Sequence, residues 1–120
     1  MDNTLHNFFE AAYYHFNNRH IDALLEMMTT DVHWPNRWEG GYLEGQQAVR
    51  DYWLRQWKEL NPRVEPESVK VLPDGRISVL VYQLVKNREG KVLSDEFVHH
   101  IYTLKDGLIQ SMDVDEEHGT

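Results

Sequence analysis

The residues best suited to chemistry lie near the C-terminus, where His100, Tyr102 and Asp113 flank the pair Asp106-Gly107. An Asp-Gly pair between two alternating runs predicts a β-hairpin with a two-residue loop. In that register Leu104 faces Ile109, Tyr102 faces Ser111 and His100 faces Asp113, and all six share one face of the sheet. The carboxylate would raise the pKa of the imidazole and leave its other nitrogen to act as acid or base near neutral pH. We predict His100, Tyr102 and Asp113 as catalytic; the alternative is a structural histidine in a polar corner.

The rest of the chain predicts the elements that position this hairpin. Apolar residues recur at helical spacing over 3–17, 20–28 and 46–60. A short strand is predicted at 32–34, between the second and third helices. Two longer strands at 64–72 and 76–86 precede the hairpin at 96–114. Pro66 predicts an edge or a bulge in the second strand. Helices followed by a meander of strands indicate the α+β class. We expect one domain over residues 1–120, a cone-shaped curved antiparallel sheet covered by three N-terminal helices.

Composition excludes several kinds of partner. Twelve Lys and Arg against twenty Asp and Glu give a net charge of −8, which opposes binding to nucleic acid and to anionic membranes. There are no cysteines, hence no disulfide and no thiol nucleophile. No apolar run is long enough to span a membrane, and the N-terminus lacks the pattern of a signal peptide, so a cytoplasmic protein is expected.

The strand at 76–86 is apolar on both faces, which bears on assembly. Three helices can cover only one face of the sheet, and the other retains Leu80, Tyr82, Leu84, Phe97 and Ile101. That is a large apolar surface to leave in water, so we expect a homodimer through it. The alternative is a monomer with scattered apolar residues on its surface.

Aromatic residues dominate the surroundings expected for the hairpin site. Tyr102 could donate to a carbonyl or enolate oxygen. The predicted lining is Tyr13, Trp34, Asn36, Trp38, Trp53, Trp57 and Val79. Trp38 and Tyr42 lie in a loop and would either plug the core or line the cavity mouth. A metal site from His33, His100 and Asp113 is not expected, because their spacing matches no compact ligand motif.

Three segments carry a resemblance to a known superfamily: NNRHIDALLEMMTTDVHW, YLEGQQAVRDYW and IYTLKDGLIQSMDV. Their order and spacing resemble the nuclear transport factor 2 superfamily, which contains ketosteroid isomerase and the SnoaL-like polyketide cyclases. The resemblance covers nearly the whole chain. It implies a cystatin-like α+β barrel, a cone whose interior often holds a small apolar ligand, and it implies no cofactor.

The comparison with the isomerase can be made residue by residue. Its hairpin aspartic acid falls on His100, its general base on Asn36 or Trp34, and its first-helix tyrosine on Ala12, next to Tyr13. Steroid isomerisation is therefore not expected, because neither residue at the base position can take a proton from carbon. The resemblance implies a cofactor-independent enzyme of isomerase, cyclase or hydrolase type on a small apolar or aromatic substrate. In such an enzyme His100 with Asp113 would transfer the proton, and Tyr102 or Asn36 would be the orienting donor. The alternatives are a non-catalytic ligand-binding module and a dimeric scaffold with a filled cone.

Overall fold

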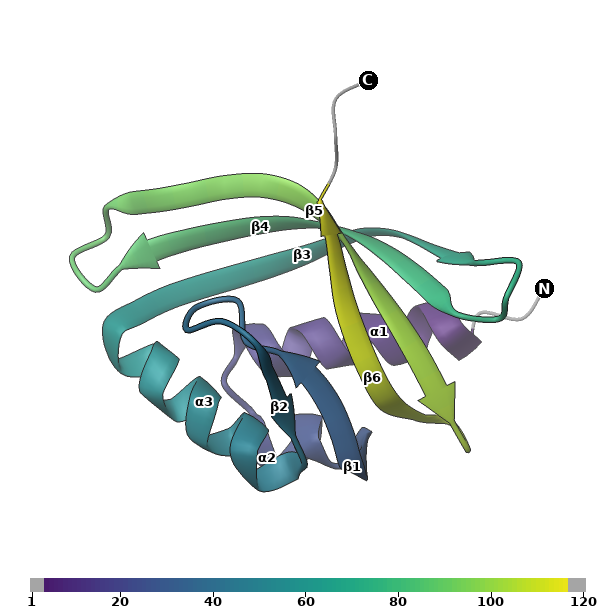
Figure 1. Ribbon diagram of the computed structural model, residues 1–120. Coiled ribbons are helices and arrows are strands. Elements are labelled where there is room, and N and C mark those ends of the chain that lie inside the picture. Colours follow the sequence, from purple (N-terminus) through teal and green to yellow (C-terminus); the bar gives the residue numbers. More distant parts are fainter. Residues whose placement is uncertain (1–3, 117–120) are drawn as a thin grey trace.

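Helices pack into the concave side of a strongly curved six-stranded sheet in the computed structural model, which describes residues 4–116 (Figure 1). The sheet has the strand order β2-β1-β6-β5-β4-β3. No helix in the described part of the chain is long and apolar enough to cross a membrane. The elements run in the order α1 (Thr4–Asn17), α2 (Ile21–Leu25), β1 (Met28–Pro35), β2 (Tyr42–Glu44), α3 (Gln46–Glu59), β3 (Leu60–Val71), β4 (Ile77–Asn87), β5 (Val92–Lys105) and β6 (Leu108–Glu116).

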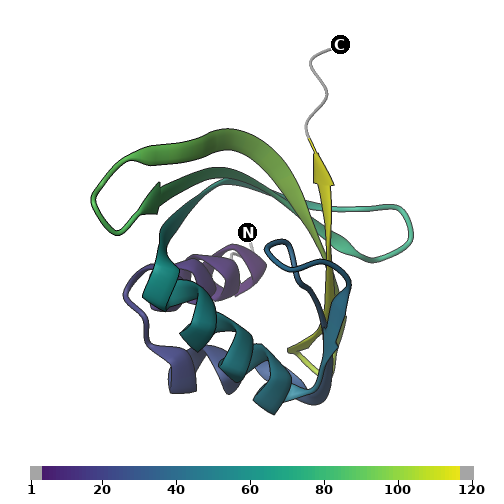
Figure 2. The ribbon, with the colours of Figure 1, turned by 60° about the vertical axis from the view of Figure 1, so that its left-hand side comes forward.

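The predicted α+β class and the helix-covered curved sheet are confirmed, with two differences in detail. The sheet stays open, since its edge strands β2 and β3 do not pair with each other. Four of its five strand pairings are antiparallel, whereas β1 runs parallel to β6. Because β1 and β6 lie far apart in the chain, no local sequence pattern indicates that they pair. Figure 2 shows α1 and α3 inside the hollow that the curved strands form.

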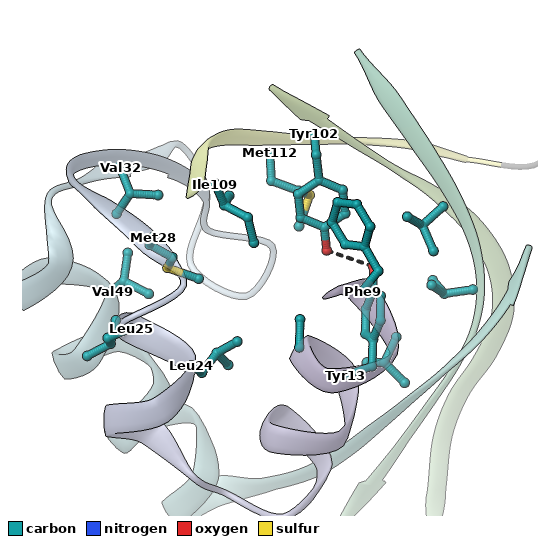
Figure 3. Packing of buried hydrophobic residues seen from close by; sticks show 14 of the residues in the cluster. Phe9, Tyr13, Leu24, Leu25, Met28, Val32, Val49, Tyr102, Ile109 and Met112 are labelled. Atoms are coloured by element: carbon teal, nitrogen blue, oxygen red, sulfur yellow. Dashed lines mark hydrogen bonds between the residues drawn. The ribbon is translucent and has the colours of Figure 1, made fainter. Parts of the chain in front are cut away.

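The core fills the space between the helices and the inner face of the sheet. Phe9 and Trp53 are at most 1% exposed and come from α1 and α3. They meet inward-facing residues of β4, β5 and β6, because alternate side chains of a strand point to the same face. Figure 3 shows Phe9 and Tyr13 beside Tyr102, and Leu24, Leu25 and Met28 grouped at the other end of the core.

Pro66 lies where its sequence context predicts. The strand that contains it, β3, is at the sheet edge, and its pairing with β4 shifts register between Pro66 and Ser68. Proline has no amide hydrogen to donate to a ladder, so an edge strand and a bulge tolerate it.

The outer face of the sheet carries the predicted apolar residues. The ring of Phe97 is 47% exposed and lies 5.2 Å, between centroids, from that of Tyr82. Leu80, Leu84 and Ile101 are partly buried on the same face.

An arginine ties the end of α1 to the start of β3. Arg19 has a φ of 61°, and its guanidinium donates hydrogen bonds to the backbone oxygens of Phe16 (3.1 Å) and Pro62 (2.9 Å) and to Oδ1 of Asn61 (2.7 Å). Its Cζ lies 4.9 Å from a ring centroid of Trp57. These contacts hold an unfavourable backbone conformation in place.

Candidate functional site

The β5–β6 hairpin contains a bulge that changes the predicted site. The turn at Asp106-Gly107 and the pair Leu104–Ile109 are as predicted, but the register then shifts by one residue on β6. His100 therefore faces Val114 and Asp113 faces Ile101. Because a shift of one residue moves every following side chain to the opposite face, the predicted pairing of His100 with Asp113 is wrong. Tyr102 likewise faces Met112 and not Ser111.

Asp113 lies exposed on the outer face, away from His100. Its Oδ1 accepts a hydrogen bond of 3.0 Å from the hydroxyl of Tyr42. The ring of Tyr42 stacks on His33 with 4.4 Å between centroids, and Nδ1 of His33 lies 2.5 Å from Oε1 of Glu44. Tyr42 is 55% exposed and Trp38 is 39% exposed, so neither plugs the core. In the described part of the chain, no three His, Asp or Glu side chains gather in a way that could hold a metal ion.

His100 has a different partner, which comes from the first helix. The hydroxyl of Tyr13 lies 2.8 Å from Nδ1 of His100 and 2.6 Å from the hydroxyl of Tyr102. All three side chains are at most 6% exposed. The helix presents Tyr13 and the strand presents His100 and Tyr102 two residues apart on one face (Figure 3 shows Tyr13 and Tyr102). We call these three residues the polar trio.

Burial keeps the polar trio uncharged. Desolvation, with a smaller contribution from the positive charge of Arg37, lowers the pKa of His100 from 6.5 to about 3. Burial also raises the pKa of Tyr13 and that of Tyr102 above the usual 10.0. The direction for His100 is opposite to the predicted rise, since no carboxylate faces it. At neutral pH the trio is a neutral chain of hydrogen bonds.

The protons of these hydrogen bonds can be arranged in two ways, which we call the first and the second order. In the first, Tyr102 donates to Tyr13, Tyr13 donates to Nδ1 of His100, and the proton on Nε2 remains available. In the second, Nδ1–H of His100 donates to Tyr13, Tyr13 donates to Tyr102, and the hydroxyl proton of Tyr102 remains available. Either order leaves one donor at one end of the chain, and the second also leaves Nε2 as an acceptor.

The polar trio lines a cavity of about 100 Å³. For comparison, an engineered apolar cavity of about 150 Å³ binds benzene. Of the predicted lining, Tyr13, Trp34 and Trp53 contribute to the wall, together with His100 and Tyr102. The other lining residues are Ala12, Phe16, Leu24, Pro35, Arg37, Tyr52, Gln56, Pro62, Val64, Gln83, Val85, Ile109, Met112 and Val114.

Four residues of the predicted lining lie outside this wall. Trp57 stacks behind Trp53, with 5.9 Å between ring centroids, and Trp38 lies on the surface. Val79 is fully buried in the core. Asn36 holds its own loop: its Oδ1 accepts from the backbone amides of Trp38 (3.2 Å) and Glu39 (2.7 Å), and its Nδ2 donates to Oε1 of Glu39 (2.9 Å). These bonds engage both ends of the Asn36 amide within its own loop.

The structure also adds polar lining residues that the sequence reading missed. Gln83 follows Val81 on the inner face of an otherwise apolar strand, and that polar interruption was the available signal. Gln56 lies one helical turn after Tyr52, and its Nε2 donates to the hydroxyl of Tyr52 at 3.3 Å. Arg37 comes from an irregular loop, where no periodic pattern marks the direction of a side chain.

Comparisons with known proteins agree with this fold. Residues 9–112 match the model of the SnoaL-like domain family. No curated protein sequence matches the chain. Many solved structures do, at sequence identities that show the fold alone.

Three of these structures illustrate the likeness. TerC, co-crystallised with polyporic acid, is 22% identical with a TM-score of 0.78 over 92% of this chain and 89% of that one. An NTF2-like protein of unknown function from Burkholderia pseudomallei is 18% identical, with a TM-score of 0.80 over 98% and 92%. The epoxide hydrolase/cyclase-like enzyme SalBIII is 21% identical, with a TM-score of 0.77 over 92% and 88%. The predicted family resemblance is thus confirmed, and the chain belongs to the SnoaL-like domain family.

Proposed function

We propose that this protein binds a small, largely apolar or aromatic molecule in the cavity, with the polar trio donating a hydrogen bond to one oxygen of that molecule. The observation that carries this proposal is the shared hydroxyl of Tyr13, 2.8 Å from His100 and 2.6 Å from Tyr102 in a wall of mainly apolar side chains. A few convergent polar groups in an apolar pocket are typical of small-molecule sites. Because the trio is neutral, it suits a carbonyl, phenol or enol oxygen.

The relatives named above support a small-molecule function. TerC was crystallised with polyporic acid, and SalBIII has a role in pyran ring formation in the polyether salinomycin. Both proteins have this fold, and in the present chain the hydrogen-bond donors of the polar trio lie inside it.

Two neutral probes of nearly equal shape test the proposal. Calorimetric titration compares para-hydroxycinnamamide with para-methylcinnamamide, which differ only in a hydroxyl and a methyl group. The wild type is compared with the double variant His100→Leu/Tyr102→Phe, which removes both ends of the trio. The matched control is His99→Leu/Tyr82→Phe, which changes the same residue types on the outer face.

The wild type and the control should bind the hydroxyl probe about tenfold more tightly than the methyl probe, as one satisfied buried hydrogen bond implies. The inner double variant should lose this preference while still binding the methyl probe. Failure of the wild type to bind either probe at millimolar concentration would refute the proposal. An unchanged preference in the inner double variant would refute the role of the trio.

The two proton orders of the trio favour a second function, cofactor-independent proton transfer. In the second order, Nε2 of His100 accepts a proton from a carbon beside a carbonyl group, and Nδ1 passes its own proton to Tyr13. Tyr13 then passes a proton to Tyr102, and Tyr102 donates one to the carbonyl oxygen. The ketone becomes an enol, and the trio ends in the first order. No charge forms on His100, which matters because a buried imidazolium is unstable here.

Hydrogen–deuterium exchange on β-tetralone tests this second function. In heavy water, the benzylic protons beside its carbonyl should exchange faster with the wild type than with His100→Leu, and the rate should saturate with ketone concentration. Equal rates for the two proteins would leave binding as the function and reject catalysis by His100.

We further propose that the protein forms a homodimer through the outer face of the sheet. Exposed Phe97 and its partly buried apolar neighbours support this assembly. Sedimentation velocity should give a dimer for the wild type and a monomer for Phe97→Asp, and a monomeric wild type would refute it. The cytoplasmic location expected from the sequence stays a prediction, for cell fractionation to test.

A further inference from the structure

The inner face of β4 leads from the buried part of the molecule to the half-buried part of the cavity wall. Val79 pairs with His100 of the polar trio, and both Val79 and Val81 are fully buried. The next two residues on this face, Gln83 and Val85, are partly exposed and line the cavity. Gln83 is therefore the polar residue at which this face passes from the core to the outer part of the cavity.

The strand pairing fixes how far Gln83 lies from the polar trio along the sheet. Gln83 pairs with Glu96 of β5, four residues before His100. Four residues of β-strand span about 13 Å. With a hydrogen bond of about 2.9 Å at each end, a ligand that joins the trio to Gln83 has polar atoms roughly 7–9 Å apart. A single aromatic ring with a short polar side chain has this length.

The carboxamide of Gln83 is available to such a ligand. Within residues 4–116 its side chain makes no hydrogen bond to another residue. The other glutamine of the cavity wall differs, because Nε2 of Gln56 donates to the hydroxyl of Tyr52 at 3.3 Å. A carboxamide presents an acceptor and a donor side by side, so a group that offers both in the same arrangement satisfies it fully. An uncharged amide is such a group.

We propose that Gln83 determines ligand specificity by forming two parallel hydrogen bonds with an amide group of the ligand, while the polar trio binds an oxygen at the ligand's opposite end. This inference rests on the proposed function and narrows its ligand class to neutral aromatic amides with such an oxygen. The ligand's N–H donates to Oε1 of Gln83, and Nε2 of Gln83 donates to the ligand's carbonyl oxygen. Both polar ends are then satisfied, and the ring packs against the apolar wall between them.

Calorimetry with para-hydroxycinnamamide and para-hydroxybenzylideneacetone tests the proposal. In the ketone a methyl group replaces the NH₂ group of the amide, so the two probes have nearly the same shape and differ in the donor for Oε1 of Gln83. The wild type is compared with Gln83→Met, which keeps the length of the side chain and removes its amide. Gln47→Met is the matched control, since Gln47 is exposed on α3 and donates to Asp51. Gln56→Met tests the other glutamine of the cavity wall.

The wild type, Gln47→Met and Gln56→Met should bind the amide about three- to tenfold more tightly than the ketone, which is the effect of one net hydrogen bond. In Gln83→Met this ratio should fall to about one through weaker binding of the amide. The preference for para-hydroxycinnamamide over para-methylcinnamamide should persist in Gln83→Met, because the hydroxyl binds at the other end of the cavity. That preference also shows that the variant is folded.

Three results would overturn the role of Gln83. Equal binding of amide and ketone by the wild type, with the preference for hydroxyl over methyl intact, would do so and leave the proposed function standing. A preference for the amide that survives in Gln83→Met, including one that is lost in Gln56→Met instead, would do the same. Failure of the wild type to bind any of these probes at millimolar concentration would overturn this inference and the proposed function together.

Discussion

Nδ1 of His100 lies 2.8 Å from the hydroxyl of Tyr13, a residue 87 positions earlier in the chain. This contact joins the first helix to the inner face of the sheet at the wall of the cavity. It also defines the chemistry of the histidine, because the partner is a neutral phenol and not a carboxylate. His100 therefore belongs to a hydrogen-bonded chain that can donate or accept without ionising.

Removing the central hydroxyl should destabilise the fold. Tyr13→Phe leaves Nδ1 of His100 and the hydroxyl of Tyr102 without their shared partner in a buried place, which should cost about 1–3 kcal/mol of unfolding free energy. Urea denaturation measures this loss. Tyr14→Phe is the matched control, because Tyr14 is the next residue and is 59% exposed. Equal stabilities of the two variants would show that the Tyr13 hydroxyl is not an important structural partner.

The stability of the protein should depend on pH through His100. Its pKa is about 3 when folded and about 6.5 when unfolded, so between these values the unfolded state binds the extra proton. Lowering the pH from 6.5 towards 3 then favours unfolding. Relative to His100→Gln, the wild type should lose about 2 kcal/mol between pH 6.5 and pH 5. Denaturation curves over this range measure the difference, and parallel pH profiles of the two proteins would contradict the buried neutral state.

Asp113 should have no influence on His100. In Asp113→Asn the nitrogen-15 resonances of the His100 ring should keep their positions, because the carboxylate lies on the outer face and accepts from Tyr42. The ring of His33, stacked on Tyr42, should respond instead. A shift of the His100 resonances in this variant would restore the direct pairing that the bulge rules out.

Arg19 should resist conservative replacement. Lysine cannot reproduce the planar fork that reaches the oxygens of Phe16, Asn61 and Pro62, so Arg19→Lys should lose about 1–3 kcal/mol of stability. Thermal and urea denaturation measure this loss. Arg63→Lys serves as control, since Arg63 pairs with Glu65 on the surface. If both variants kept wild-type stability, the contacts of Arg19 would not stabilise the fold.

Local patterns in the sequence predicted much of this fold. The periodicity of Phe9, Tyr13 and Phe16 marks α1 and its buried side, and Asp106-Gly107 marks the turn with positive φ at both residues. The same kind of helical pattern marks Trp53 on the buried side of α3, and its side chain lies in the cavity wall. The pattern did not distinguish Trp57, one turn later, from the residues that line the cavity. The ring of Trp57 lies behind Trp53 and beneath the guanidinium of Arg19.

The candidate site depended on features that are not local. One extra residue on β6 decides which face Asp113 occupies, and no residue type in that strand marks the bulge. The partner of His100 comes from another element, so only the packing of α1 against the sheet brings the two together. The sequence therefore indicated His100, Tyr102 and Tyr13 as residues of interest, while the three-dimensional arrangement determined how they are connected.

The proposed site requires that His100 meets the ligand inside the cavity. Nitrogen-15 histidine spectra recorded during titration with para-hydroxycinnamamide test this directly. The His100 ring resonances should shift saturably, while those of His33 and His99, which lie towards the outer face, stay in place. Saturable binding by calorimetry with unchanged His100 resonances would place the ligand elsewhere and contradict the account.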